Sequence, residues 1–329
     1  MILVTGGAGY IGSHTVKLLL RAGYEVVIFD DLSSGHREFI LTPHFVQGDL
    51  RDQTAVEEVF SRYPIRGVIH FAALTKVGES VEDPEPYYAV NVVGGLNLLR
   101  AMRDHAVRNI VFSSSAAVYG DPQELPIRED HPKAPKSPYG RTKWIFEEIL
   151  GDYARAYGMR YISLRYFNAA GSDPEGEIGE WHEPESHLIP IVLEVALGLR
   201  DHLEIFGTDY DTPDGTCIRD FIHVVDLAEA HVLALRALEE GKGNTAYNLG
   251  TGVGHSVRQV VEICQEVTGR EIKAVPAPRR LGDPPALVAD PSRAMAELGW
   301  KPRFTDLKDI VRTAWDWMRK LYRERGKVA

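Results

Sequence analysis

The sequence predicts an α/β protein with a doubly wound parallel sheet and a smaller C-terminal α/β lobe. Three observations support this prediction. A glycine-rich turn follows a short apolar run at the N-terminus, apolar runs alternate with helical periods to about residue 170, and residues 171–186 then form a loop rich in glycine, proline and acidic residues. This alternation is typical of a Rossmann-like sheet, in which ligands collect at the carboxyl ends of the strands.

The first strand, residues 2–5, leads into the turn Gly6-x-x-Gly9-x-x-Gly12, a helix and a second strand that ends at Asp30. Glycines let the backbone turn tightly and approach a pyrophosphate at a helix N-terminus. Asp30 follows Gly12 by 18 residues. An acidic residue at about this distance from the glycine turn binds the adenosine ribose hydroxyls of a dinucleotide. Asp30 and Asp31 together would repel a 2′-phosphate, so we expect NAD rather than NADP. A glycine turn without a ligand is the alternative.

Further strands are expected near residues 45–46, 68–71, 110–112 and 161–164, with helices near 55–62, 87–105 and 138–157. Several candidate site residues stand where these strands end. We expect them to line one crevice at the carboxyl edge of the sheet. They are Asp49, Phe71 to Ala73, Ser113 to Ser115, and Phe167 with Asn168.

A candidate catalytic group lies at the start of the helix near 138–157. Ser137 is a good N-cap and Pro138 suits the first helical position, which places Tyr139 and Lys143 on one helix face. A neighbouring cation favours the phenolate, so we expect Lys143 to lower the pKa of Tyr139 and allow proton transfer. The hydroxyl of Ser115 could complete a proton path to a sugar alcohol. A tyrosine and a lysine at this spacing are also common on ordinary surfaces.

The second half of the chain is expected to form the smaller lobe, which would bind substrate. We assign residues 1–170 plus about 222–250 to the dinucleotide-binding domain, and 171–221 plus about 251–329 to the lobe. Residues 222–238 and 247–250 are expected to return to the main sheet. A proline-rich loop is expected over 276–285 and a final helix over 307–322.

Composition excludes some classes of protein. The net charge of −10 argues against a nucleic-acid partner, and the two cysteines are too few for a disulfide framework. The first strand begins at residue 2, which leaves no room for a signal peptide. The apolar run over 189–199 is too short to span a bilayer and carries Glu194, so we expect a cytoplasmic protein without membrane contact.

Several stretches, taken together with the glycine turn, resemble a known family. They are VTGGAGYIGSHT, HFAALTKVGES, FSSSAAVYGD, SPYGRTK, RYFNAAG, CIRDFIHVVDL and APRRLGD. In this order they are similar to the extended short-chain dehydrogenases/reductases, and most of all to the UDP-glucose 4-epimerases among them. The resemblance runs from residue 2 to about residue 300.

The resemblance implies reversible 4-epimerisation of UDP-glucose and UDP-galactose, a step of galactose metabolism, with tightly bound NAD. Tyr139 would exchange the proton of the sugar O4, Lys143 would hold the nicotinamide ribose, and Ser115 would bind the O4 and relay the proton. The likeness also implies a homodimer. The residues expected to contact NAD are Gly6, Gly9, Tyr10, Ile11, Gly12, Asp30, Asp31, Leu32, Ser33, Ser34, Gly35, Asp49, Leu50, Phe71, Ala72, Ala73, Leu74, Asn91, Tyr139, Lys143 and Phe167.

By the same likeness, the UDP-sugar would contact Ser115, Tyr139, Asn168, His187, Leu188, Glu204, Ile205, Phe206, Arg219, Arg280, Asp283 and Leu287. Arginine forks suit a pyrophosphate, although Arg219 could instead pair with Asp220 and Arg280 could be solvated.

Four positions depart from the family pattern or leave a question open. Thr75 or Lys76 could occupy the place of a lysine that contacts the cofactor in relatives. His187 replaces a common asparagine, and Leu287 has an intermediate size that does not decide whether N-acetylated sugars enter. His182, His187 and the nearby glutamates have an irregular spacing that fits no familiar ligand set, so no metal is expected.

Other readings remain at this point. A 4,6-dehydratase would need an acid and a base after the serine, where this chain has Ala116 and Ala117. An epimerase for UDP-N-acetylglucosamine or UDP-glucuronate shares the core chemistry. A non-catalytic NAD-binding sensor could share the fold.

Overall fold

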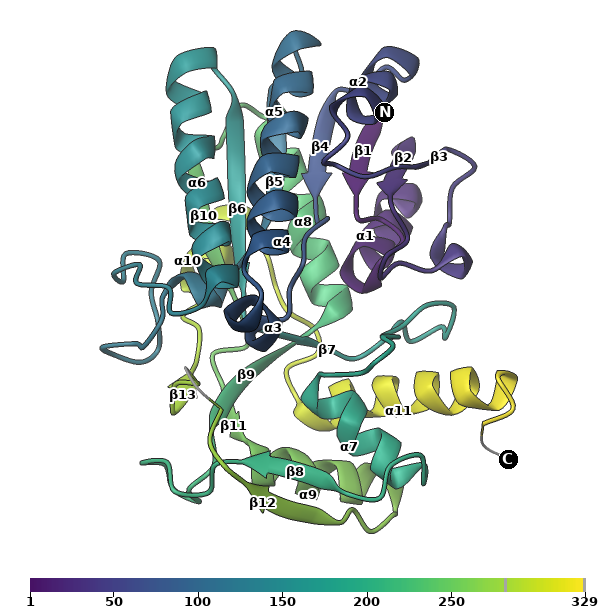
Figure 1. The fold of residues 1–329 in the computed structure, drawn as a ribbon, viewed down its shortest axis with the longest axis vertical. Helices are drawn as coiled ribbons and strands as arrows, with labels where there is room; N and C mark the ends of the chain where they lie inside the picture. Colours follow the sequence, from purple (N-terminus) through teal and green to yellow (C-terminus); the bar gives the residue numbers. More distant parts are fainter. Residues whose placement is uncertain (281–282, 328–329) are drawn as a thin grey trace.

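The computed structural model describes residues 1–280 and 283–327 and confirms the expected fold class (Figure 1). Its main sheet has seven parallel strands in the order β10-β6-β5-β4-β1-β2-β3, which is the Rossmann arrangement extended by one strand. The strands are β1 (Ile2–Thr5), β2 (Val26–Asp30), β3 (Phe45–Gln47), β4 (Gly67–His70), β5 (Asn109–Ser115), β6 (Arg160–Tyr166) and β10 (Thr245–Leu249).

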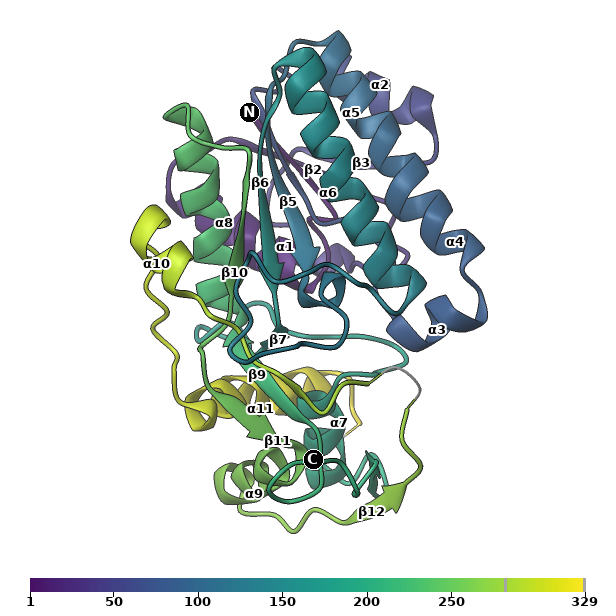
Figure 2. The same ribbon diagram turned by 90° about the vertical axis from the view of Figure 1, so that its left-hand side faces the viewer.

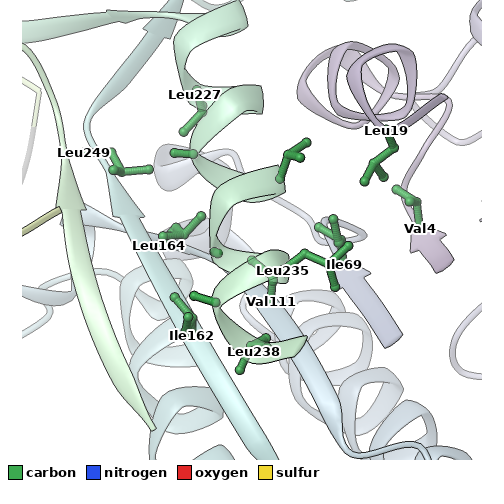
Figure 3. Close-up of a cluster of buried hydrophobic side chains, with 14 of the residues drawn as sticks. Val4, Leu19, Ile69, Val111, Ile162, Leu164, Leu227, Leu235, Leu238 and Leu249 are labelled. Atoms are coloured by element: carbon green, nitrogen blue, oxygen red, sulfur yellow. The ribbon is translucent and has the colours of Figure 1, made fainter. Parts of the chain in front are cut away.

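Helices cover both faces of this sheet, as Figure 2 shows. Successive residues of a strand point to opposite faces, so Val4 and Leu3 enter different cores. On one face, α1 (Tyr10–Arg21) and α8 (Val224–Glu239) pack on Val4, Ile69, Val111 and Ile162 (Figure 3). On the other face lie α2 (Gln53–Arg62), α5 (Gly95–Asp104) and α6 (Pro138–Tyr157).

A smaller lobe lies beyond the carboxyl ends of the main strands (Figure 1). It contains a four-stranded sheet and a two-stranded sheet, covered by helices with a hydrophobic core of their own. The strands are β7 (Asn168–Ala170), β9 (Ile218–His223), β11 (Gly254–Ser256) and β13 (Ala286–Leu287), and the pair β8 (Leu203–Phe206) and β12 (Ala274–Ala277). The helices are α7 (Leu188–Ala196), α9 (Val257–Thr268) and α11 (Leu307–Glu324).

Some element boundaries differ from the expectations. The helix expected over 87–105 consists of α4 (Glu85–Tyr88), a π-helical segment (Ala89–Gly94) and α5. Residue 222 belongs to β9 of the lobe, so the chain returns to the main sheet only with α8. Residues 276–277 of the expected proline-rich loop are the end of β12, and residues 281–282 of that loop lie outside the described residues. The domain boundaries remain a prediction.

Shorter helical segments complete the described chain. They are η1 (Arg37–Phe39), α3 (Val77–Glu82), η3 (Ala116–Val118) and α10 (Ser292–Leu298). Across the described parts of the chain, no helix is both long enough and apolar enough to cross a membrane.

Candidate active site

The glycine turn between β1 and α1 is packed so closely that side chains would not fit. A Cβ at Gly12 would lie 2.1 Å from the carbonyl oxygen of Gly6. Gly6 itself has a φ of +72°, and a Cβ there would lie 2.6 Å from the Ala72 nitrogen. Gly9 is the N-cap of α1 and offers no side-chain acceptor, so the first N–H groups of this helix remain available to an anion.

Asp30 ends β2 beside this turn. Its Oδ2 accepts a hydrogen bond from the Ala8 nitrogen at 2.9 Å and its Oδ1 accepts one from the Leu32 nitrogen at 2.9 Å. Burial raises the pKa of the carboxyl, and these two hydrogen bonds oppose that shift. Gly35 is needed here because its Cβ would lie 2.9 Å from Asp30 Oδ1. The carboxylate is therefore fixed in place, with lone pairs left for ribose hydroxyls.

Ser115 and Tyr139 meet at the carboxyl end of β5. Ser137 caps α6 by accepting from the Gly140 nitrogen at 3.1 Å, as expected, and this cap sets Tyr139 in the first turn. Burial raises the pKa of the phenol, while a hydrogen bond from Ser115 lowers it. We expected the pKa of Tyr139 to fall, and this is wrong when only the groups of the protein act on it. The cost of removing the phenolate from water outweighs the hydrogen bond from Ser115.

Lys143 lies one helical turn further along α6. Its Nζ donates to the Ser113 carbonyl at 2.9 Å and lies 5.9 Å from the centre of the Tyr139 ring. Burial lowers the pKa of this lysine to about 7, and Glu147 one turn further on opposes the shift. Glu147 is itself held by a buried ion pair with Arg165 at 2.6 Å. The ammonium is thus anchored beneath the phenol rather than directed at solvent.

A cavity of about 1450 Å³ joins the glycine turn to the lobe. Ser115 and Tyr139 line it, as do most of the residues expected to contact NAD or the UDP-sugar. These are Gly6, Gly9, Tyr10, Ile11, Gly12, Asp30, Asp31, Ser33, Ser34, Asp49, Leu50, Phe71, Ala72, Ala73, Leu74, Phe167, Asn168, His187, Leu188, Glu204, Phe206, Arg219, Arg280 and Asp283. Thr75 and Lys76 both line the cavity as well, so either residue is placed to contact the cofactor.

The remaining expected residues do not line the cavity, and they are Leu32, Gly35, Asn91, Lys143, Ile205 and Leu287. Asn91 bonds to both backbone groups of Leu74 and so holds a wall residue in place. Ile205 is buried because alternate residues of β8 face opposite ways, which leaves Glu204 and Phe206 on the cavity side. Leu287 packs in a small buried cluster with Phe167 and Ala116.

Two arginines line the part of the cavity formed by the lobe. Arg219 donates to the Pro284 carbonyl at 2.9 Å and lies 3.6 Å from Asp283. Its alternative pairing with Asp220 is wrong, since Asp220 accepts instead from Thr251 and neighbouring backbone groups. Arg280 is exposed, and its guanidinium lies 3.9 Å from the centre of the Phe206 ring. Both guanidinium groups can meet an anion in this part of the cavity.

Three further residues, which the sequence suggested only as possible metal ligands, also belong to the cavity wall. Glu180, His182 and Glu185 line the cavity beside His187, and the His187 Nδ1 lies 3.0 Å from both carboxylates. Burial would lower the pKa of His187, but Glu180 and Glu185 outweigh it and raise the pKa above its ordinary value. The alternation of glutamate and histidine over 180–187 was the available signal, but a loop has no periodicity from which convergence can be predicted.

Comparison with known proteins places this architecture in a family. Residues 2–250 match the model of the NAD dependent epimerase/dehydratase family. The chain belongs to this family. A UDP-glucose 4-epimerase of Halalkalibacterium halodurans is 52% identical over 316 residues, which cover 96% of this chain and 95% of that protein.

Solved structures agree with this assignment. A UDP-glucose 4-epimerase of Brucella ovis, in complex with NAD, is 53% identical with a TM-score of 0.93, over 96% of this chain and 97% of its own. A UDP-glucose 4-epimerase of Bifidobacterium longum, in complex with NAD⁺ and UDP, is 41% identical with a TM-score of 0.92, over 97% of this chain and 98% of its own.

The residues of this chain fit an NAD molecule on physical grounds. Gly6, Gly9 and Gly12 line the cavity with backbone alone, and the uncapped N-terminus of α1 lies at the same turn, where a pyrophosphate can accept from its N–H groups. Asp30 and Asp31 supply acceptors for ribose hydroxyls and a negative field against a 2′-phosphate. These features match the donor and acceptor pattern of the unphosphorylated dinucleotide.

Proposed function

We propose that this protein is an NAD-dependent isomerase that interconverts UDP-glucose and UDP-galactose by inversion at C4 of the sugar. The observation that carries the proposal is the group formed by Ser115, Tyr139 and the buried Lys143 at the end of a cavity large enough for two nucleotides. Membership of the epimerase family supports the same reaction.

Tyr139 is positioned to exchange the proton of the sugar O4. It hydrogen-bonds to Ser115, whose hydroxyl can pass the proton between the O4 and the phenol. Burial raises the pKa of Tyr139, so a cation is needed to favour the phenolate. Lys143 lies close by, and it supplies that charge in its protonated form, although burial lowers its pKa to about 7. When bound, NAD supplies the oxidant that accepts two electrons from C4 and later returns them. Inversion requires the sugar to present both faces of C4, and the wide cavity allows that rotation.

The lobe is proposed to hold the UDP part. Arg219 and Arg280 lie opposite the carboxyl ends of the main strands and suit the diphosphate, with Phe206 beside them as an apolar surface for the base. Leu188 lines the cavity at the start of α7, a helix without a side-chain cap at its N-terminus. Such an end favours an anion.

A homodimer located in the cytoplasm is part of the proposal. Val93 is exposed beside α5, and half-exposed Leu96 and Ile145 lie on α5 and α6. Apolar side chains on two adjacent helices support association through this face. Cys217 and Cys264 are both free and buried, which supports a reducing compartment.

Replacement of the phenol tests the proposed reaction. Tyr139→Phe removes the proton-transfer group but keeps the ring, so turnover of UDP-galactose is expected to fall about 100-fold or more. The measurement is the rate of UDP-glucose formation by protein purified with its NAD. Retained NAD content and an unchanged melting temperature are the controls that the variant is folded. Turnover close to that of the unsubstituted protein would refute the role of Tyr139.

A further inference from the structure

The face of α6 that carries Tyr139 and Lys143 continues with a third titratable residue, Glu147. Residues four positions apart lie on the same side of a helix, so the phenol, the ammonium and this carboxylate follow one another along α6. Glu147 is 6% exposed and does not line the cavity, so it is not placed to touch a ligand there. A buried charge is unfavourable unless other groups hold it, and the contacts of this carboxylate therefore need an account.

Two neighbouring strands hold the carboxylate of Glu147. From β6, Arg165 Nη2 donates to its Oε2 at 2.6 Å and Arg165 Nε donates to its Oε1 at 3.0 Å, which is a bidentate arrangement. From β5, the hydroxyl of Ser114 donates to Oε1 at 2.6 Å. Arg165 is held in turn, because its Nη1 donates to the Tyr119 hydroxyl at 3.0 Å. The carboxylate is therefore fixed in orientation beside the end of β5.

The end of β5 joins this carboxylate to the reacting groups. Lys143 Nζ donates to the Ser113 carbonyl at 2.9 Å, and the hydroxyl of the next residue, Ser114, donates to the carboxylate. Ser115 follows directly and hydrogen-bonds to Tyr139. Adjacent residues of one strand thus receive the ammonium and the carboxylate, which places both charges on the same side of α6. The carboxylate also helps to fix the strand end that carries Ser115.

The titratable groups around Lys143 come from three elements. On α6, the carboxylate of Glu147 opposes the effect of burial, which lowers the pKa of Lys143 to about 7. From β4, His70 faces the ammonium, but burial and that charge lower the pKa of His70 to about 3, so the imidazole is neutral. From β6, Tyr166 stays neutral because burial raises the pKa of its phenol, and Arg165 is paired with Glu147. The carboxylate is therefore the negative charge that helps this lysine to keep its proton.

We propose that Glu147 is a positioning residue, which keeps Lys143 charged beneath the phenol of Tyr139. It acts through the ammonium and does not touch the sugar. Arg165 and Ser114 contribute by holding its carboxylate in place. This role rests on the proposed function and extends it to a residue outside the cavity.

Glu147→Gln tests this role, because it removes the charge and keeps the size of the side chain. Lys143 then loses its proton at a lower pH, and without this cation the phenolate of Tyr139 forms at a higher pH. The rising limb of the pH profile of turnover should move to higher pH and the falling limb to lower pH. We expect the turnover number near pH 7 to fall about 10-fold or more, with the Michaelis constant for UDP-galactose within a few-fold.

Direct titration of the phenol separates this role from the proposed reaction. The ultraviolet absorption of the protein with its NAD, minus that of the same protein with Tyr139→Phe, reports the ionisation of Tyr139 without turnover. We expect the midpoint of this ionisation to rise by about one pH unit or more in Glu147→Gln. Absence of UDP-sugar interconversion in the unsubstituted protein would refute the proposed function, whereas an unmoved midpoint would refute the role of Glu147.

Two further variants control for folding. Loss of Glu147 leaves Arg165 buried without its partner, which is strongly destabilising. Glu147→Gln combined with Arg165→Gln removes both charges and is the second variant, with the same expected shift of the midpoint. Asp226→Asn is the matched control, because Asp226 is a fully buried acid on α8, which covers the other face of the main sheet. It should leave the midpoint and the pH profile unchanged. An unmoved midpoint in the folded Glu147 variants, or the same shift in Asp226→Asn, would overturn the proposal.

Discussion

Arg279 and Arg280 are neighbours in sequence with different surroundings. Arg280 lies over Phe206 and lines the cavity. Arg279 donates to Asp209 Oδ1 at 2.7 Å and covers the Tyr210 ring at 4.2 Å, and it is not part of the cavity wall. Substitution of each arginine in turn therefore distinguishes two effects. Loss of either one removes a positive charge, but only loss of Arg280 removes a side chain that lines the cavity.

Arg280→Ala is expected to raise the Michaelis constant for UDP-galactose about 10- to 100-fold, because a hydrogen bond to a charged group contributes roughly 1.5–3 kcal/mol. The turnover number and the NAD content should change little, since the NAD side of the cavity is formed by the main sheet. Steady-state kinetics with the UDP-sugar as varied substrate measure both constants. Arg279→Ala is the matched control and should leave the Michaelis constant within a few-fold. Equal effects of the two substitutions would reject a specific role of Arg280 in binding the diphosphate.

At the scale of single residues, the positions of side chains were predicted from the sequence more accurately than the directions of pKa shifts. The cap at Ser137 and the spacing of Tyr139 and Lys143 depend only on local helix geometry, and both were predicted. The direction of the Tyr139 pKa depends on burial by distant segments, and that prediction was wrong. Contacts between residues of a loop were equally hard to predict. Glu180 and His187 approach each other because the loop folds back on itself, and no local sequence pattern indicates that.

Elements with strong local constraints were predicted well. The turn from Gly6 to Gly12 requires glycine for steric reasons, and the parallel strands carry continuous apolar runs because both faces are buried. The π-helical segment over 89–94 was not predicted, since its apolar pattern differs little from that of an α-helix. The strand β12 was missed because Pro276 and Pro278 suggested a loop. Among the described residues β12 pairs with β8 alone, so its other edge needs no N–H donors and tolerates proline.

The exposed face of α5 and α6 gives a prediction at the scale of elements. Val93 is 51% exposed in the π-helical segment that precedes α5, so Val93→Asp would place a charge in the proposed dimer interface. Burial of an unpaired charge is unfavourable, and the variant is expected to sediment as a monomer. Val253→Asp is the control, because Val253 is 50% exposed on the lobe. Analytical ultracentrifugation measures both masses. A monomeric unsubstituted protein, or a dimeric Val93→Asp variant, would contradict the proposed interface.

At the scale of the whole molecule, four of the five histidines that are buried among the described residues have strongly lowered pKa values. They are His14, His70, His223 and His231, each with at most 2% of its surface exposed. Burial lowers the pKa of His14 and His231 to about 4 and that of His70 and His223 to about 3. In the unfolded chain each imidazole titrates near pH 6.5, so the native state binds fewer protons than the unfolded state below that pH.

The free energy of unfolding should therefore fall as the pH drops from about 6.5 toward 4. Each neutral histidine contributes a slope of up to about 1.4 kcal/mol per pH unit, because the unfolded state takes up the extra proton. Buried carboxyls with raised pKa values, such as Asp30 and Asp220, oppose this loss as the pH approaches their own pKa, so the slope is best read between pH 6.5 and 5. Urea unfolding at saturating NAD measures the free energy of unfolding in a buffer of each pH, and the slope follows from these values. His231→Leu should reduce the slope by about one proton whatever its effect on stability at pH 7.5. An unchanged slope in His231→Leu would show that this imidazole is protonated inside the folded protein.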